Sequence, residues 1–229
     1  MKRIIEPMVD FDPRFTEVIF LDIECYVPPE ARKQSKGSMI YNPARTDHFV
    51  LGGVFRRVFP LQNRIEQPWQ VWNWEREAEK TTLQKIYDYF NESWRLIEGR
   101  TFNNPDLILV GTGISRLDIP ALYVRSALHH IDCEEALYET YFKTKIVDLG
   151  DVGIPLFKNN MAIYPLYPKT TNALISRLKI QSRKTSGKSV WELYETQQFE
   201  AIKERTASEV EDAFEIASDI VSRIVSGKL

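Results

Sequence analysis

Two hydrophobic periods alternate along the chain, and each predicts a different kind of element. Residues 17–23 form a largely apolar run that ends in acidic side chains, which predicts a buried strand. The runs 49–59 and 70–74 also have the pattern of strands, and their order favours an antiparallel meander of all three. Gly52 and Gly53 lie inside the second run, where glycines often mark a β-bulge.

The period changes to three and four residues over 75–94, which predicts an amphipathic helix. The apolar run 107–110 then has the length of a buried parallel strand. The elements expected after it are a helix from residue 118 to about 130, a helix over 134–142, a strand over 145–149, a helix over 171–180 and a mostly helical region over 190–229. This succession of strands and helices predicts an α/β protein.

The composition fits a globular chain whose overall charge does not attract nucleic acid. The chain has 229 residues, the size of one large domain or two small ones, and 43% of them are hydrophobic, which is enough for a substantial core. The formal net charge is −2. Binding of an anionic polymer therefore needs a local basic patch or a bridging metal ion.

The cysteine and histidine content argues against a zinc site or a disulfide framework. Cys25 and Cys133 are the only cysteines, no metal-ligand spacing joins them, and only three histidines are present. This content fits a reducing, cytoplasmic setting. The N-terminus has no pattern of a signal peptide and no apolar run reaches about 18 residues, so we expect no membrane-spanning segment.

Asp22 and Glu24 are the first candidate functional residues. They are two apart on the strand predicted over 17–23, so both side chains point to the same face. Two hard oxygen ligands side by side suit Mg²⁺ or Mn²⁺. The alternative is an acidic pair at a strand edge that faces water. A long polar loop follows over residues 26–47, either as a functional segment or as a solvated insertion.

A Gly-x-Gly sequence follows the strand predicted over 107–110. It lacks the third glycine and the βαβ context of a dinucleotide-binding loop, so we reject that function. The segment 111–118 instead predicts a loop that delivers Asp118 to the start of a helix, with Pro120 at an early helical position. A plain helix N-cap is the alternative role for Asp118.

Asp212 borders the apolar stripe of the C-terminal helical region, where a carboxylate can face a metal ion across a gap. The alternative is an acidic solvent-facing side, which Glu209, Glu211 and Glu215 also supply. The basic segment 181–189 is interpreted as a mobile surface loop, with contacts to phosphates as the alternative.

Taken in order, these features resemble the DEDD superfamily of 3′–5′ exonucleases. Residues 20–24 are similar to its first motif, residues 109–122 to its second, and an Asp-Ala pair in the C-terminal helix to its third. Gly113 stands where the family often has Asn. The resemblance covers roughly residues 15–225 and implies a ribonuclease H-like α/β fold with a mixed five-stranded sheet flanked by helices.

That resemblance implies a single exonuclease domain over residues 1–229. The small archaeal exonucleases that degrade single-stranded DNA are its most similar members. By position, the catalytic residues, which are also the ligands of two divalent ions (Mg²⁺ or Mn²⁺), would be Asp22, Glu24, Asp118 and Asp212. A single strand usually needs aromatic and cationic contacts, for which the candidates are Tyr26, Arg116 and Lys188.

The third motif departs from the family pattern. Ala207 and Ser208 stand where the family usually has His or Tyr before the last acidic residue. Glu211 therefore stays an alternative to Asp212, and the usual helper of the attacking water is not identifiable. Either Arg205 or Lys203 is a candidate to stabilise charge instead.

The activity implied by the resemblance is metal-dependent hydrolysis of single-stranded DNA from its 3′ end, with a role in DNA repair. A homo-oligomer, a trimer among the options, is compatible with it. Two alternatives remain open from the sequence. One is an RNA exonuclease of the same fold, because sugar preference depends on contacts to the 2′-hydroxyl. The other is a catalytically inactive nucleic-acid-binding module.

Overall fold

A computed structural model describes residues 16–32, 41–75, 78–98, 106–157, 167–181 and 189–227. The strands are β1 (Thr16–Tyr26), β2 (Phe49–Phe59), β3 (Arg64–Ile65), β4 (Trp69–Trp72), β5 (Asp106–Gly111) and β6 (Lys145–Asp148). The α-helices are α1 (Pro29–Arg32), α2 (Glu79–Glu98), α3 (Asp118–Leu128), α4 (Glu134–Phe142), α5 (Leu149–Val152), α6 (Thr171–Leu178), α7 (Val190–Glu195) and α8 (Phe199–Val225). Two short 3₁₀ helices are η2 (Pro60–Gln62) and η3 (Ile154–Phe157).

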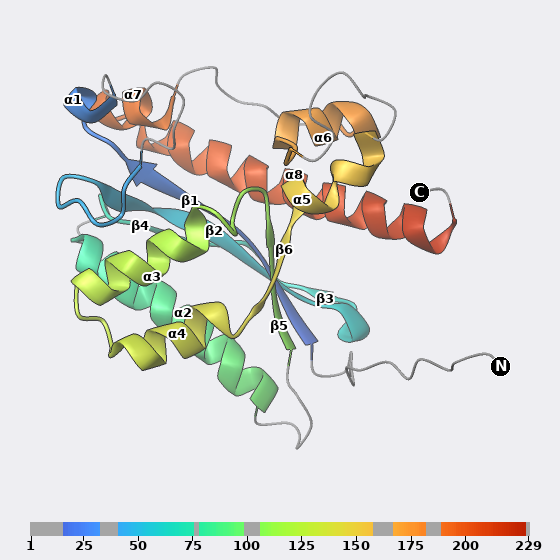
Figure 1. Cartoon of the computed structure of the whole chain (residues 1–229), viewed down its shortest axis with the longest axis horizontal. Helices are drawn as coiled ribbons and strands as arrows, with labels where there is room; N and C mark the ends of the chain where they lie inside the picture. Colours follow the sequence, from blue (N-terminus) through green and yellow to red (C-terminus); the bar gives the residue numbers. More distant parts are fainter. Residues whose placement is uncertain are drawn as a thin grey trace.

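The strands form one mixed sheet in the order β3-β2-β1-β5-β6, and β4 also pairs with β2. The central strand β1 is antiparallel to β2 and parallel to β5, which is parallel to β6. The predicted α/β class is confirmed, and a mixed sheet flanked by helices is consistent with a ribonuclease H-like fold (Figure 1). The sheet has six strands rather than five, because the two-residue β3 is too short to show in the sequence pattern.

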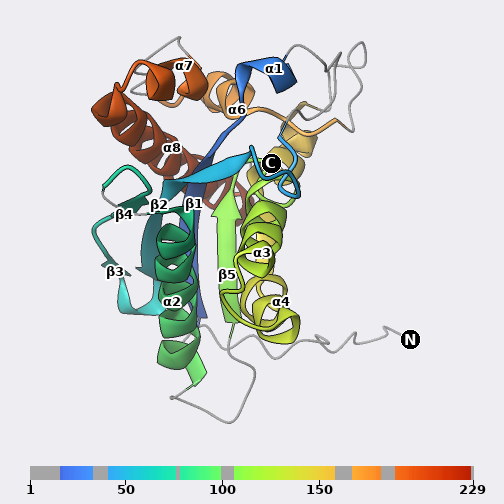
Figure 2. The same cartoon turned by 90° about the vertical axis from the view of Figure 1, so that its left-hand side faces the viewer.

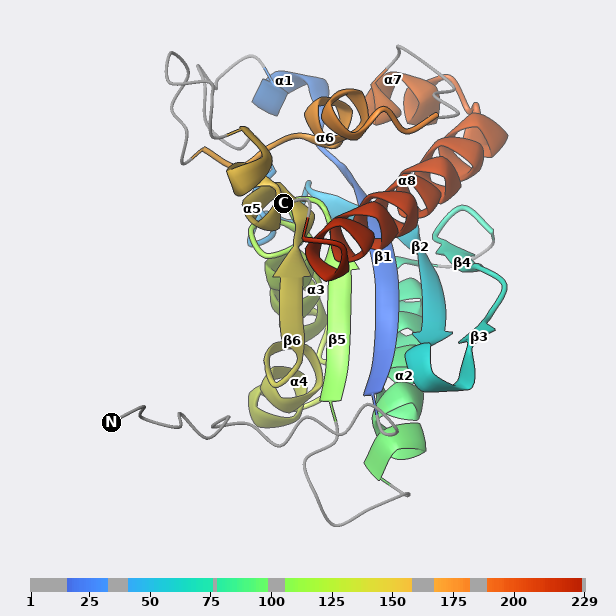
Figure 3. The same cartoon turned by 90° about the vertical axis from the view of Figure 1, so that its right-hand side faces the viewer.

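Helices cover both faces of the sheet. On one face, α2 and α3 run beside each other with α4 next to them (Figure 2). On the other face, the long helix α8 runs diagonally across the strands, with α6 and α7 near it (Figure 3). Because side chains alternate along a strand, Ile19, Leu21 and Ile23 of β1 pack in the core with α2, whereas Phe20 packs in the core with α8.

Most predicted elements are present with shifted ends. The helix expected over 75–94 is α2, which begins at Glu79. The C-terminal helical region is divided into α7 and α8, because the chain turns between them at Gln197, whose φ of 55° is left-handed. The loop expected over 26–47 contains the single turn α1, and its residues 33–40 lie outside the described residues. Within the described chain, no helix is both long and apolar enough to cross a membrane.

The glycines of β2 form a β-bulge opposite the acidic end of β1, as expected. The β1–β2 register shifts there: Glu24 lies opposite Gly52, whereas Cys25 lies opposite Val50. Gly52 has a φ of 142°, and a Cβ atom at this position would lie 2.0 Å from the carbonyl oxygen of Val71. Only glycine fits at this point, and it leaves the sheet surface beside Glu24 without a cross-strand side chain.

Gly52→Ala is expected to lower the free energy of unfolding by about 1–3 kcal/mol. Alanine is strained at this backbone conformation, and its methyl group would overlap β4. Urea denaturation measures the loss. The matched control is Gly113→Ala, where φ is 82° but no described atom lies within 4 Å of the added Cβ. An equal loss in both variants would contradict the steric argument.

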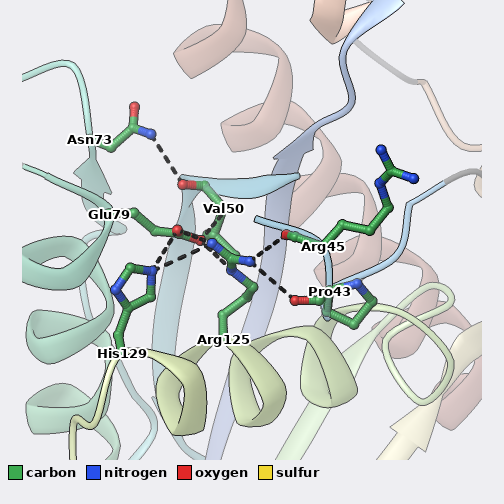
Figure 4. A network of polar contacts seen from close by, with 7 residues as sticks. All are labelled: Pro43, Arg45, Val50, Asn73, Glu79, Arg125 and His129. Carbon is green, nitrogen blue, oxygen red and sulfur yellow. Dashed lines mark hydrogen bonds and ion pairs between the residues drawn. The ribbon is translucent and has the colours of Figure 1, made fainter. Parts of the chain in front are cut away.

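A buried ionic network holds α3 in place (Figure 4). Arg125 of α3 binds Glu79 of α2 through two nitrogens: Nε donates to Oε1 at 2.8 Å, and Nη2 donates to Oε2. Arg125 Nη1 donates to the carbonyl oxygens of Pro43 and Arg45, at 3.1 and 2.8 Å. Glu79 Oε1 also accepts the backbone N–H of Val50 at 2.8 Å. The network thus joins α2, α3, β2 and the segment before β2.

Candidate metal centre

Acidic side chains from the second half of β1 face α8. Asp22 and Glu24 alternate with residues that pack against α2, so both carboxylates point to the α8 side of the sheet. Glu209 of α8 joins them there. One carboxylate oxygen from each of the three residues lies within 4.8 Å of the other two. Such a cluster of hard oxygen atoms has the spacing and chemistry of a divalent-cation site.

Asp22 carries a buried carboxylate oxygen without a partner in the described part of the chain. Its Oδ2 atom is inaccessible to solvent and has no hydrogen-bond partner among the residues that the structure describes. Burial raises the pKa of Asp22 well above its ordinary 3.8, and the charges of Glu209, Glu24 and Asp118 raise it further. A buried carboxylate among other carboxylates needs either a proton or a cation.

The helix α8 contributes a hydroxyl and a cation to the site besides the carboxylate of Glu209. Burial raises the pKa of Glu24 from 4.5 to about 8, and Glu209 adds to the rise while the charge of Arg205 opposes it. Thr206 Oγ1 donates to Glu24 Oε1 at 3.2 Å, and Arg205 Nε donates to Glu209 Oε1 at 3.1 Å. An acid, a hydroxyl and a cation from two turns of α8 therefore meet the carboxylates of β1.

Asp118 approaches the three-carboxylate group from the start of α3, although among the described residues it is not a member of that group. Its Oδ1 accepts the backbone N–H of Ile23 at 2.9 Å, beyond the point where the β1–β5 ladder ends. The N-cap residue of α3 is Leu117, so Asp118 is the first residue of the helix and not its N-cap. Burial raises the pKa of Asp118 from 3.8 to about 7 against the lowering effect of its backbone hydrogen bonds, while Asp148 and Glu209 raise it further.

Asp148, at the end of β6, fixes the loop that carries Asp118. Its carboxylate accepts the backbone N–H groups of Gly113 at 2.9 Å, Ser115 at 3.2 Å and Gly150 at 3.0 Å, and the Ser115 hydroxyl at 2.6 Å. Sequence reasoning missed this residue. The available signal was an acid at the end of an apolar strand, which also marks Asp22. Four donors identify Asp148 as a structural clamp.

The structure adds an α8 residue to the acids expected from the sequence, and the role of Asp212 stays a prediction. Glu209 belongs to the three-carboxylate group, although the sequence placed it on a solvent-facing side. Asp212 is buried but is not a member of that group in the described chain, and it lies about 4.5 Å further along the helix axis. Glu211, the alternative from the sequence, forms an ion pair with Arg56 instead.

The residues expected to contact a DNA strand stay predictions. The Tyr26 hydroxyl donates to Glu195 Oε1 at 3.0 Å, and its ring stacks on Phe49 with centroids 4.9 Å apart. Arg116 is exposed near Asp118, and its Nη2 lies 3.3 Å from Asp151 Oδ1. Lys188 lies outside the described residues.

Comparisons with known proteins give a fold and no family. No family model matches the sequence, and no curated protein is significantly similar to it. A solved structure with a similar fold is the family B DNA polymerase from the hyperthermophilic archaeon Pyrobaculum calidifontis, with a TM-score of 0.54 and 14% sequence identity. The match covers 90% of this chain and 24% of the polymerase chain. The chain thus spans about a quarter of that protein, and the likeness concerns the fold alone.

Proposed function

We propose that this chain is a divalent-metal-dependent 3′–5′ exonuclease that hydrolyses single-stranded DNA. The observation that carries the proposal is the convergence of Asp22, Glu24 and Glu209 within 4.8 Å. Asp118 lies beside them through its bond to Ile23, and the buried Asp22 Oδ2 lacks a described partner. Crowded carboxylates repel one another when they are ionised, and a shared divalent cation would remove that repulsion.

The donor set fits Mg²⁺ or Mn²⁺, because it consists of carboxylate oxygens and contains no soft ligand. Asp22, Glu24 and Glu209 would hold the metal, with Asp118 as the neighbouring carboxylate. Two dications would balance these four charges. Such ions, when bound, lower the pKa of a coordinated water and stabilise charge on phosphate oxygens.

The groups of the chain itself organise the site for hydrolysis. Thr206 orients Glu24 by a hydrogen bond, and Asp118 fixes the β1 backbone between the two acids of that strand. In the proposed reaction a water oxygen forms a bond to phosphorus and the P–O3′ bond breaks. The departing O3′ takes a proton, so the shortened strand keeps a 3′-hydroxyl and a nucleoside 5′-monophosphate is released.

A single strand of DNA is the proposed substrate. The net charge of −2 means that a polyanion must be held by local cations, among which Arg116 and Lys188 stay candidates with the stacking residue Tyr26. The resemblance of the motifs supports DNA, and the structural neighbour is named as a DNA polymerase. A single strand of RNA is the alternative substrate, because RNA differs from DNA mainly by the 2′-hydroxyl that a site must accept or reject.

The test compares oligonucleotides labelled at the 3′ or the 5′ end, with Mg²⁺, Mn²⁺ or EDTA. We expect wild type to release labelled mononucleotide at once from the 3′ end and to shorten the 5′-labelled strand stepwise, only with metal. Asp22→Asn is expected to be inactive, because it removes the central carboxylate. Asp219→Asn is the control, since its carboxylate pairs with Arg223 on the same helix and lies outside the cluster.

Equal behaviour of wild type and Asp22→Asn would rule out the proposed activity. A matched RNA strand tests the sugar preference, and faster cleavage of RNA would replace DNA as the substrate. Binding that persists in EDTA without cleavage under any metal would instead identify a non-catalytic module.

A further inference from the structure

Arg205 is a cation built into the carboxylate cluster. It lies one turn before Glu209 on α8, and its Nε donates to Glu209 Oε1 at 3.1 Å. The residue that follows it, Thr206, contacts Glu24, so this turn of the helix faces the acids of β1. The side chain of Arg205 is 29% exposed. The side chain of Glu209 is 38% exposed, so the ion pair is reachable from solvent.

We propose that Arg205 binds the phosphate at the reacting 3′ end of the substrate. This inference rests on the proposed function and adds a substrate-binding residue to that site. A guanidinium presents several N–H donors in a plane, which match two oxygens of a phosphate. A guanidinium has donors and no acceptor, so Arg205 cannot act as the base that takes a proton from water.

The charges at the site support this role. The carboxylates of Asp22, Glu24, Asp118 and Glu209 carry four negative charges, which two divalent ions only neutralise. A phosphodiester adds one further negative charge. Arg205 supplies the matching positive charge from within hydrogen-bonding distance of the cluster. The charges of the site would then balance with substrate bound, which favours binding.

A purely structural ion pair is the competing role, and the chain offers a matched control for it. Arg223 of α8 also bonds through Nε to an acid four residues away, Asp219, at 2.5 Å. That pair has the same spacing as Arg205 and Glu209 but lies outside the carboxylate cluster. Arg223→Met therefore removes an equivalent helix-surface cation without touching the site.

The experiment measures kcat and KM of wild type, Arg205→Met, Arg205→Lys and Arg223→Met on a single-stranded oligonucleotide. We expect Arg205→Met to lose about a hundredfold in kcat/KM. Arg205→Lys should recover part of this loss, and Arg223→Met should match wild type. Titration with Mn²⁺ in the absence of DNA should show an affinity for Arg205→Met no weaker than that of wild type, because the arginine is not a metal ligand.

A binding measurement separates this inference from the proposed function. Fluorescence anisotropy with a labelled oligonucleotide in Ca²⁺ gives the affinity at several salt concentrations. Loss of one phosphate contact should reduce the slope of log K against log salt by about 0.7 in Arg205→Met alone. Equal slopes for Arg205→Met and Arg223→Met would overturn the assignment, as would a parallel loss of Mn²⁺ affinity. If wild type does not cleave, the proposed function fails and the salt slope still decides the role of Arg205.

Discussion

Glu209→Gln is expected to reduce the proposed cleavage by about 10²–10³-fold, because it removes one of the three carboxylates of the candidate metal site. Asp212→Asn is expected to keep most of the activity of the folded protein, since Asp212 is not part of that group. Both substitutions replace a carboxylate by an amide of the same size, and they lie three residues apart on α8. They therefore differ mainly in the position of the lost charge. Steady-state cleavage rates and Mn²⁺ titration of both variants measure the difference.

The opposite result would restore the prediction made from the sequence. If Asp212→Asn abolishes cleavage and metal binding while Glu209→Gln does not, the third acidic motif ends at Asp212. Asp219→Asn serves as the reference for loss of one negative charge on α8, because Asp219 pairs with Arg223 away from the cluster. Thermal unfolding of each variant shows whether a loss of activity comes from loss of fold.

The metal-free protein is expected to become less stable as the pH rises from about 5 to 8. The pKa of Asp118 is raised from 3.8 to about 7 and that of Glu24 from 4.5 to about 8, chiefly by burial. Between the ordinary and the raised values, the folded protein binds more protons than the unfolded chain. The free energy of unfolding therefore falls with pH in this window, by an amount on the order of a few kcal/mol.

Divalent metal should reverse this trend. Mg²⁺ or Mn²⁺ binds the ionised carboxylates of the folded state, so added metal should raise the unfolding temperature most at pH 8 and least at pH 5. Thermal scans in EDTA and in Mn²⁺ across this range provide the measurement, and Glu24→Gln should flatten the profile in EDTA. An unfolding temperature in EDTA that increases from pH 5 to 8 would contradict the buried, uncompensated state of these acids.

The β1 half of the site could be predicted because it depends on local rules. Alternation places Asp22 and Glu24 on one face of a strand, and the Gly-x-Gly loop after β5 indicates that Asp118 begins a helix. Both expectations agree with the geometry. The two-residue β3 and the turn at Gln197 gave no comparable signal, because a pattern needs several residues before its period is visible.

The contribution of α8 to the site depends on how the helix is rotated about its own axis, and the sequence does not determine that rotation. Val210, Ala213 and Ile216 form the buried stripe of α8, and Glu209 and Asp212 each precede a member of that stripe by one residue. Periodicity therefore treats the two acids alike. How α8 crosses the sheet is determined by its packing against Phe20 and its neighbours, and that packing brings Glu209 to the β1 acids (Figure 3).

The distance along the chain between Asp22 and Glu209 has a consequence for biosynthesis. A ribosome that has completed β1, β2 and β5 has produced a sheet with exposed acids, but not the helix that closes the cluster over them. A nascent or truncated chain without α8 therefore lacks Glu209, and the three-carboxylate group can form only after α8 has left the ribosome and packed on the sheet. Such dependence on remote contacts also predicts slow maturation of the site relative to the local helices α2, α3 and α4.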